Sequence, residues 1–274
     1  MVSLTLFLFA TTICLILKRV NSCTGDKCNN WDQIDLGNYL YIQSDPWGSG
    51  NAKQGWCECI SGSTSGPATV DFEFYANDGS NNHVMAYPSI VAGWNFGNYK
   101  YGQGKGGLPL LTSDVQKGAK LMTSWSVSYK TSNSNTTGDA FDVAWDIWLG
   151  PSNGQTNPGS PSGELMIWIN SQNETPWGTL KADNLTFWNT KWKFYLNEGG
   201  SGTPLWAFER IEKTWDVSDV DLAEFVNYLA ENKYINSTQY LLGVQCGTEL
   251  FQGKGSFTHT YKLDVSNPNE FMDK

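Results

Sequence analysis

The 274-residue sequence is poor in histidine and in charge, with two histidines and a charged fraction of 16%. His83 and His259 lie far apart in the chain and form no metal-ligand motif, so we expect neither a metal nor another cofactor. The 18 Lys and Arg residues are outnumbered by 27 Asp and Glu, giving a formal net charge of −9. A phosphate backbone is bound through a basic stripe, so this balance argues against a nucleic-acid partner.

Long hydrophobic runs are also absent, apart from one at the N-terminus. Leu4 to Leu17 are apolar, Lys18 and Arg19 follow, and small residues lead up to Ser22. The run is shorter than the roughly 20 residues that cross a hydrocarbon core. The pattern predicts a signal peptide over residues 1–22 and a secreted mature chain over 23–274, free of the membrane. The basic pair follows the apolar run instead of preceding it, which leaves an uncleaved anchor as the alternative.

Six cysteines are present, and one of them, Cys14, lies within the predicted signal peptide. Two close pairs near the new N-terminus favour disulfides in an oxidising compartment, and their spacing is not that of a zinc site: Cys23, Cys28, Cys57 and Cys59. Cys246 is interpreted as a buried thiol. Four Asn-x-Ser/Thr sequences are candidate glycosylation sites: Asn135, Asn173, Asn184 and Asn236.

What the sequence has in abundance is aromatic residues and glycine, with 13 Trp, 12 Tyr, 13 Phe and 28 Gly. Short runs rich in β-branched and aromatic residues recur between clusters of Gly, Asn, Ser and Pro: 39–43, 69–76, 121–129, 140–149, 164–169, 185–189, 191–196, 205–210, 240–245 and 256–265. Many strands at this spacing predict an all-β sandwich or barrel, and one such domain accommodates the whole mature chain.

One helix is expected, between the strands predicted at 205–210 and 240–245. Ser218 is placed to cap it, and Asp221 follows three residues later, as in a capping box. The apolar residues after it repeat at helical spacing: Leu222, Phe225, Val226 and Leu229. We interpret this helix as a packing element without chemistry.

Three strands carry acids on faces that are neither plain core nor plain surface. Alternation places Leu165, Ile167 and Ile169 on one face of residues 163–170 and leaves Glu164, Met166, Trp168 and Asn170 on the other. Residues 141–149 likewise leave Asp142, Ala144, Asp146 and Trp148 opposite the core side, and residues 245–251 place Gln245, Gly247, Glu249 and Phe251 together. The long-looped hairpin lets Asp146 face Glu164 across the strand pair.

A single acid in a strand most often faces solvent, and most tryptophans fill cores. Carboxylates beside Trp and Met instead suit a groove for sugars, which offer apolar C–H faces for stacking and hydroxyls that need polar partners. The residues alone therefore leave a solvated strand face and a sugar-binding groove as the two interpretations.

The sequence resembles glycoside hydrolase family 12, a family of secreted β-1,4-glucanases and xyloglucanases. The likeness spans nearly the whole mature chain. It rests on an ordered set of short motifs: Cys28-Asn-Asn-Trp31, Pro46-Trp47-Gly48, Ala86-Tyr87-Pro88, Val-Ala-Trp-Asp-Ile-Trp at 143–148, Glu-Leu-Met-Ile-Trp at 164–168, Gln239-Tyr240-Leu241 and Gly-Thr-Glu at 247–249. The resemblance implies a β-jelly-roll of two curved antiparallel sheets with one packed helix.

Carried over position by position, the resemblance implies Glu164 as nucleophile, Glu249 as general acid/base and Asp146 as the acid that orients Glu164. It implies a cleft lined by Trp31, Trp47, Tyr87, Phe96, Met166 and Trp168. It also implies a disulfide between Cys28 and Cys57, which would leave Cys23 and Cys59 as a second pair. Two positions depart from the family: Asp45 stands where Asn is usual, and Phe96 where the bacterial branch often has Trp.

The implied function is a retaining endo-β-1,4-glucanase that acts as a monomer on soluble or amorphous β-glucan. A xyloglucan-specific enzyme of the same family is the alternative, and the loops 95–107 and 150–163 are expected to decide between them. A non-catalytic carbohydrate-binding jelly roll needs no paired glutamates, so fold alone does not separate it from the enzyme. A xylanase of the sister family is disfavoured because the 164–168 motif has the glucanase form.

Overall fold

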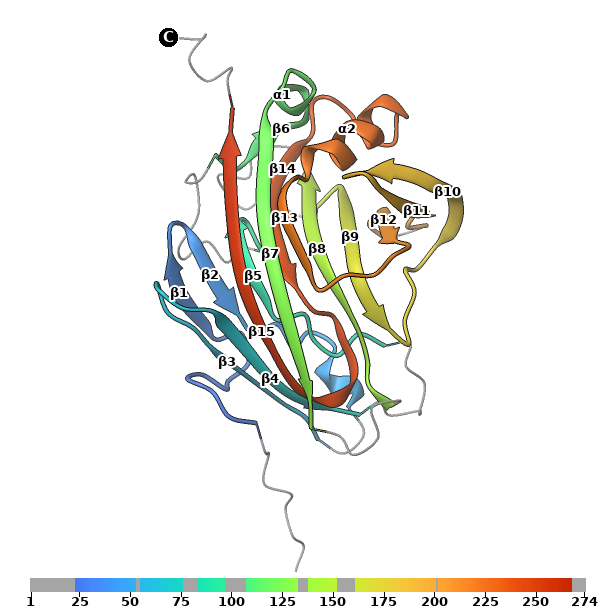
Figure 1. Ribbon diagram of the computed structural model, residues 1–274. Helices are drawn as coiled ribbons and strands as arrows, with labels where there is room; N and C mark the ends of the chain where they lie inside the picture. Colours follow the sequence, from blue (N-terminus) through green and yellow to red (C-terminus); the bar gives the residue numbers. More distant parts are fainter. Residues whose placement is uncertain are drawn as a thin grey trace, which may run out of the picture.

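Two β-sheets packed face to face form the body of the protein (Figure 1). The computed structural model describes residues 23–52, 55–75, 83–96, 107–132, 138–151, 161–200 and 202–267. The predicted signal peptide, residues 1–22, and the predicted glycosylation site Asn135 lie outside the described residues. So does most of each of the two loops expected to set substrate preference.

The smaller sheet has the strand order β3 (Cys57–Ser61), β4 (Ala68–Phe74), β15 (Leu250–Ser266), β7 (Lys120–Thr131) and β13 (Asp216–Asp221). The larger sheet has the order β1 (Gln33–Gly37), β2 (Leu40–Gln43), β5 (Ser89–Gly93), β14 (Tyr240–Gly247), β8 (Ala140–Gly150), β9 (Gly163–Gln172), β12 (Leu205–Arg210), β11 (Thr190–Asn197) and β10 (Thr179–Phe187). The short β6 (Leu110–Leu111) also pairs with β14. The first residues of β15 pair with β8, so this strand joins the two sheets.

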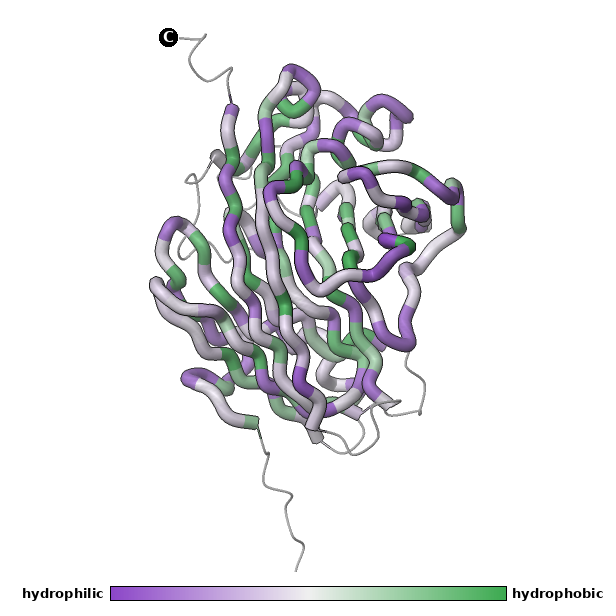
Figure 2. The backbone as a smooth tube through the Cα atoms, in the orientation of Figure 1, coloured by the Kyte–Doolittle hydropathy of each residue, from purple (hydrophilic) through white to green (hydrophobic). Residues whose placement is uncertain are grey.

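The core lies between the sheets, where alternate residues of facing strands meet. Val143, Trp145 and Ile147 of β8 are fully buried there, as the alternation predicts. The Trp145 ring meets that of Trp125 from β7 at 4.7 Å between centroids in an edge-to-face contact. Figure 2 shows the same alternation of hydrophobic and hydrophilic residues along the strands. The predicted all-β sandwich is confirmed, and the other face of β8 and β9 is left free for a site.

Two features of the sheets differ from the prediction of antiparallel strands and one helix. β9 and β12 pair in parallel, because β10 and β11 intervene in the chain and β12 then inserts between β11 and β9. A second, short helix, α1 (Thr112–Gln116), precedes β7, and a 3₁₀ turn, η1 (Ser49–Asn51), follows β2. The strand expected at 185–189 is the end of β10, and Trp188 and Asn189 form its turn with positive φ of 50° and 56°.

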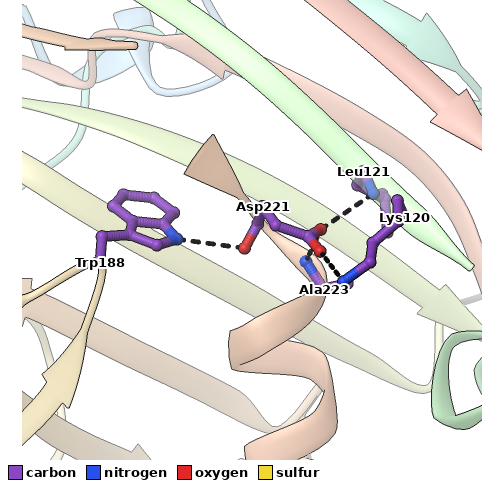
Figure 3. Close-up of polar contacts among 5 residues, drawn as sticks. All are labelled: Lys120, Leu121, Trp188, Asp221 and Ala223. Carbon is purple, nitrogen blue, oxygen red and sulfur yellow. Dashed lines mark hydrogen bonds and ion pairs between the residues drawn. The ribbon is translucent and has the colours of Figure 1, made fainter. Parts of the chain in front are cut away.

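The predicted helix exists as α2 (Ala223–Glu231), but Ser218 does not cap it. Ser218 lies within β13, which runs up to the helix and ends at Asp221. The carboxylate of Asp221 instead accepts the Ala223 N–H at 3.0 Å and so satisfies a donor of the first turn (Figure 3). The pattern of small and acidic residues identified the helix but placed its start too early, because the same residues also suit an exposed edge strand.

The disulfide pairing implied by the resemblance is wrong. Cys23 is bonded to Cys57, and Cys28 is bonded to Cys59. Lys27 and Ile60 form an antiparallel bridge with backbone hydrogen bonds of 3.0 and 2.8 Å, which places Cys28 beside Cys59 with 4.1 Å between their Cα atoms. Strand register therefore decides the partner, and the spacing of cysteines in the sequence does not contain that register.

Asp221 ties three elements together (Figure 3). Its carboxylate accepts the Leu121 N–H at 3.0 Å and pairs with the Lys120 ammonium at 2.9 Å, in addition to capping α2. Its carbonyl accepts the indole N–H of Trp188 at 3.1 Å. One buried side chain thus joins β7, β13 and the helix.

We predict that Asp221→Ala lowers the free energy of unfolding by about 2–3 kcal/mol, because it removes a helix cap and leaves buried N–H groups unpaired. Chemical denaturation monitored by tryptophan fluorescence measures the change. Asp216→Ala is the matched control, since Asp216 is the exposed first residue of the same strand. Equal stability of the two variants would contradict this role.

Candidate active site

A cleft of about 790 Å³ lies on the face of the larger sheet that points away from the core. Its floor comes from β8, β9, β14 and the start of β15, and loops after β2 and β5 add to its walls. The cleft is lined by Trp31, Gln43, Asp45, Trp47, Val84, Tyr87, Asn95, Phe96, Asp146, Trp148, Glu164, Met166, Trp168, Trp177, Leu205, Gln245, Glu249 and Phe251. All residues proposed from the sequence as catalytic or cleft-lining are in this set.

The aromatic residues of the cleft divide into exposed rings and buried support. Trp31, Trp47 and Phe96 are 52%, 55% and 60% exposed, so their rings are free to stack on a ligand. Tyr87 is buried, and its hydroxyl donates to the carbonyl of Ala144 at 3.0 Å. Tyr87 therefore supports the floor of the cleft and offers no free stacking face.

Glu164 and Asp146 meet on the cleft floor through the register of β8 and β9. Asp146 lies directly opposite Met166, and Trp148 lies opposite Glu164. The two acids are therefore diagonal neighbours, whereas the sequence suggested that they face each other directly. Their carboxyl groups are hydrogen-bonded. Since two ionised carboxylates cannot share a hydrogen bond, one of the pair carries a proton.

Glu249 lies between two strands rather than within one. β14 ends at Gly247 and β15 begins at Leu250, so Glu249 is in the connection. Its carbonyl accepts the backbone N–H of Asp142 at 3.1 Å, and its own N–H donates to the Asp142 carboxylate at 3.4 Å. These contacts hold Glu249 against β8, on the same cleft floor as Glu164.

Burial and mutual repulsion raise the pKa values of these acids. Burial, followed by the charge of Glu249, raises the pKa of Glu164 to about 8, and the hydrogen bond from Asp146 partly opposes this rise. Burial also raises the pKa of Glu249, and it raises that of Asp146 well above the ordinary range. The cleft floor therefore retains protons at pH values where exposed carboxyls are ionised. Because the two glutamates repel each other, they titrate as a pair.

Two further acids approach the same point. Burial, then the charge of Glu249, raises the pKa of Asp45 to about 7 and that of the half-buried Glu174 to about 7. Behind Asp45, the buried Glu58 accepts the Asp45 N–H at 3.3 Å. The departure from the family's usual Asn at position 45 thus adds an ionisable group that faces Glu249.

Several cleft residues were not identified as site residues from the sequence. Trp148 and Gln245 were placed on the correct strand faces but were given no role. Trp177, which is 48% exposed, lies in the connection before β10, where no periodic pattern marks it. Asn95 follows β5 in the segment that adjoins Phe96. These four residues enlarge the aromatic and amide lining.

Residues 58–267 match the family model described as "Glycosyl hydrolase family 12". The chain belongs to this family. Endoglucanase S of Pectobacterium parmentieri is 28% identical over 92% of this chain and 91% of its own length. The xyloglucan-specific endo-β-1,4-glucanase A of Emericella nidulans is 25% identical over 88% and 92%. The glycoside hydrolase class expected from the sequence is thereby confirmed.

Solved structures of the family agree with the fold. A family 12 xyloglucanase from Bacillus licheniformis superimposes with a TM-score of 0.75 at 27% identity, covering 88% of this chain and 99% of that one. Endoglucanase cel12A from Rhodothermus marinus gives 0.72 at 26% identity, covering 88% and 98%. The jelly-roll prediction is confirmed.

The raised pKa values make stability depend on pH in a defined direction. A carboxyl whose pKa is higher in the folded than in the unfolded chain binds its proton more tightly when folded, so stability falls as pH rises. The contribution is complete below the ordinary carboxyl pKa of about 4 and is lost as pH rises through about 7 for Asp45 and about 8 for Glu164.

We predict that the melting temperature falls between pH 5 and pH 8, and that Glu164→Gln raises it by a few degrees at pH 8 with little effect at pH 5. Differential scanning calorimetry at both values measures this. The exposed Glu212→Gln serves as control and should follow the wild type. If the melting temperature of Glu164→Gln fell as much between pH 5 and pH 8 as that of the wild type, Glu164 would not be a carboxyl with a raised pKa.

Proposed function

We propose that the protein is a secreted, retaining endo-β-1,4-glucanase in which Glu164 is the nucleophile and Glu249 the general acid/base. The observation that carries the proposal is the presence of two partly buried glutamates on one cleft floor, close enough for the charge of one to raise the pKa of the other. Retaining glycosidases place two carboxyl groups on either side of the scissile bond, about 5–5.5 Å apart.

The reaction begins when protonated Glu249 donates its proton to the glycosidic oxygen and ionised Glu164 attacks the anomeric carbon. The bond to the leaving sugar breaks as the bond to Glu164 forms. A water molecule then attacks the glycosyl-enzyme, giving its proton to Glu249 and releasing Glu164 as carboxylate. The raised pKa of Glu164 favours its protonated form before substrate binds, so the reactive form of the coupled pair is the one in which the proton lies on Glu249. The hydrogen bond from Asp146 supports that form, because it favours ionised Glu164.

The cleft suits a chain of glucose units rather than a single sugar. Exposed rings of Trp31, Trp47 and Phe96 offer apolar faces, and Gln43, Asn95 and Gln245 offer amides to hydroxyl groups. These features support a polymeric β-1,4-glucan as substrate. We propose cellulose-type and mixed-linkage β-glucans as the preferred substrates.

Xyloglucan is the second candidate. It is favoured by the similarity to the Bacillus licheniformis xyloglucanase, whose TM-score of 0.75 is accompanied by 27% identity. A panel of tamarind xyloglucan, barley glucan, xylan and carboxymethylcellulose, assayed by reducing-end release, separates the two. Faster release from xyloglucan than from barley glucan would move the assignment to the alternative, and release from none would leave a carbohydrate-binding jelly roll.

Secretion is proposed from the chain's own features. Two disulfides are the state expected in an oxidising compartment. Within the described residues, no helix has both the length and the apolar character needed to span a membrane. Asn173, Asn184 and Asn236 are exposed and remain candidates for glycosylation, and the amide of Asn173 also donates to the carbonyl of Asp139 at 2.8 Å. We propose that the mature protein acts as a monomer.

We predict that Glu164→Gln and Glu249→Gln each lower kcat on the preferred polysaccharide by about 100-fold or more, because acid/base assistance alone contributes 10²–10⁴-fold. Isothermal titration with a cello-oligosaccharide should still detect binding to both variants. Glu73→Gln is the matched control, since Glu73 lies on the smaller sheet and pairs with Lys254. A Glu164→Gln variant with a tenth of the wild-type rate would exclude Glu164 as nucleophile.

A further inference from the structure

Asp142 is a buried acid that the mechanism above leaves without a role. It lies on β8 four residues before Asp146 and is 0% exposed. Its carboxylate oxygen Oδ2 is buried, and among the described residues no N–H or hydroxyl group donates a hydrogen bond to it. An ionised carboxylate in that position would lose its hydration with only partial compensation, so Asp142 is expected to be held as the protonated acid.

The group that faces Asp142 is Glu249. The two residues form a backbone pair, in which the Asp142 N–H donates to the Glu249 carbonyl at 3.1 Å. Asp142 Oδ1 accepts the Glu249 N–H at 3.4 Å, and the two carboxyl groups are themselves hydrogen-bonded. Because Glu249 is in the connection between β14 and β15, Asp142 makes the contacts that a strand ladder would otherwise provide.

The surrounding charges favour a proton on Asp142. Burial raises the pKa of Asp142 well above its ordinary range, the charge of Glu249 raises it further, and Glu174 adds to the effect. The groups that face Glu249 from the other packed elements are Asp45, Tyr87, Asp146, Glu164 and Glu174. All are acidic or phenolic, and the described residues that line the cleft include no Lys or Arg. A protonated neighbour is therefore what stabilises a negative charge on Glu249.

We propose that Asp142 is a positioning residue for Glu249, which it holds by its backbone pair and to which it donates a hydrogen bond whenever Glu249 is ionised. This inference rests on the proposed function. When Glu249 gives its proton to the glycosidic oxygen, the O–H of Asp142 stabilises the resulting carboxylate. When Glu249 takes a proton from the attacking water, Asp142 still keeps its own. β8 then supplies one acid for each glutamate, Asp146 for Glu164 and Asp142 for Glu249.

The test compares substrates that differ in their need for an acid. A β-glucan has a poor leaving group and needs Glu249 in the first step, whereas a 2,4-dinitrophenyl β-cellobioside does not. For Asp142→Ala we expect kcat/KM on barley glucan or xyloglucan to fall about 10- to 100-fold, the range that a hydrogen bond to a charged group carries. The pre-steady-state burst of dinitrophenolate should stay within about 3-fold of wild type, because it reports attack by Glu164 alone.

The pH profile gives a second readout that a merely structural role would not move. Loss of the hydrogen bond from Asp142 raises the pKa of Glu249, so the alkaline limb of kcat/KM on the glucan should shift to higher pH. Asp142→Asn keeps both an acceptor for the Glu249 N–H and a weaker donor for its carboxylate. Its limb should lie between those of wild type and Asp142→Ala, and its rate should be closer to wild type. If Asp142→Ala does not fold, Asp142→Asn carries the test alone.

Asp139→Ala is the matched structural control. Asp139 is a buried acid just before β8 whose carboxylate accepts hydrogen bonds from Tyr129 and Thr131 at 2.6 and 2.8 Å. Its loss should lower the melting temperature without moving the alkaline limb or the ratio between substrates. For the Asp142 variants, an unmoved limb or equal losses on glucan and aryl glycoside would overturn this inference alone, provided that the wild type cleaves glucan. A wild type that cleaves no β-glucan would overturn the proposed function and this inference together.

Discussion

The site depends on carboxyl groups that the fold holds largely out of water and close together. Glu164 and Glu249 come from residues 85 positions apart in the chain and share a floor because β8 lies between β9 and β14. The cost of burying charge keeps protons on this floor, and the repulsion between the glutamates prevents both from ionising freely. A glycosidase needs this state, with one acid protonated and one ionised.

The burial of acids around the cleft floor lowers the stability of the fold. Asp45, Glu58, Asp142 and Asp146 are all buried near the glutamates, and several of their oxygen atoms accept no hydrogen bond from an N–H or hydroxyl group of the described residues. A protein selected for stability alone would place amides or apolar residues there. The two packed sheets supply the compensation, through an aromatic core in which Trp125, Trp145 and Phe257 are fully buried. Destabilising features such as these buried acids are concentrated where function requires them.

The parts of the site that lie on regular strands could be predicted from the sequence. Period-2 alternation assigned Glu164, Met166 and Trp168 to one face of β9, and the structure places all three in the cleft. Alternation cannot supply register, so it did not reveal that Asp146 opposes Met166 or that Cys28 pairs with Cys59. The exposed, acidic β13 was missed, because its residues look like a loop that leads into a helix cap.

Site residues that lie outside regular strands, or that depend on long-range contacts, were harder to predict from the sequence. Glu249 was identified by resemblance although the strand that was expected to carry it ends at Gly247. Trp177 lies in a connection without any pattern, and only the folded chain brings it to the cleft. Asp142 was placed on the correct face but without a partner, since its contact with Glu249 spans 107 residues of sequence. Long-range contacts of this kind follow from topology and not from local sequence.

The most direct test of the central claim is the configuration of the product when it first forms. Proton NMR of a cello-oligosaccharide or xyloglucan oligosaccharide digest, recorded within the first minutes, resolves the α and β anomeric protons of the new reducing end. Direct attack by Glu164 with Glu249 as acid/base predicts that the β anomer appears first and that the α anomer grows in later by mutarotation. Initial release of the α anomer would contradict the account, because inversion requires direct attack by water on the anomeric carbon, with the two carboxyl groups too far apart for a covalent intermediate.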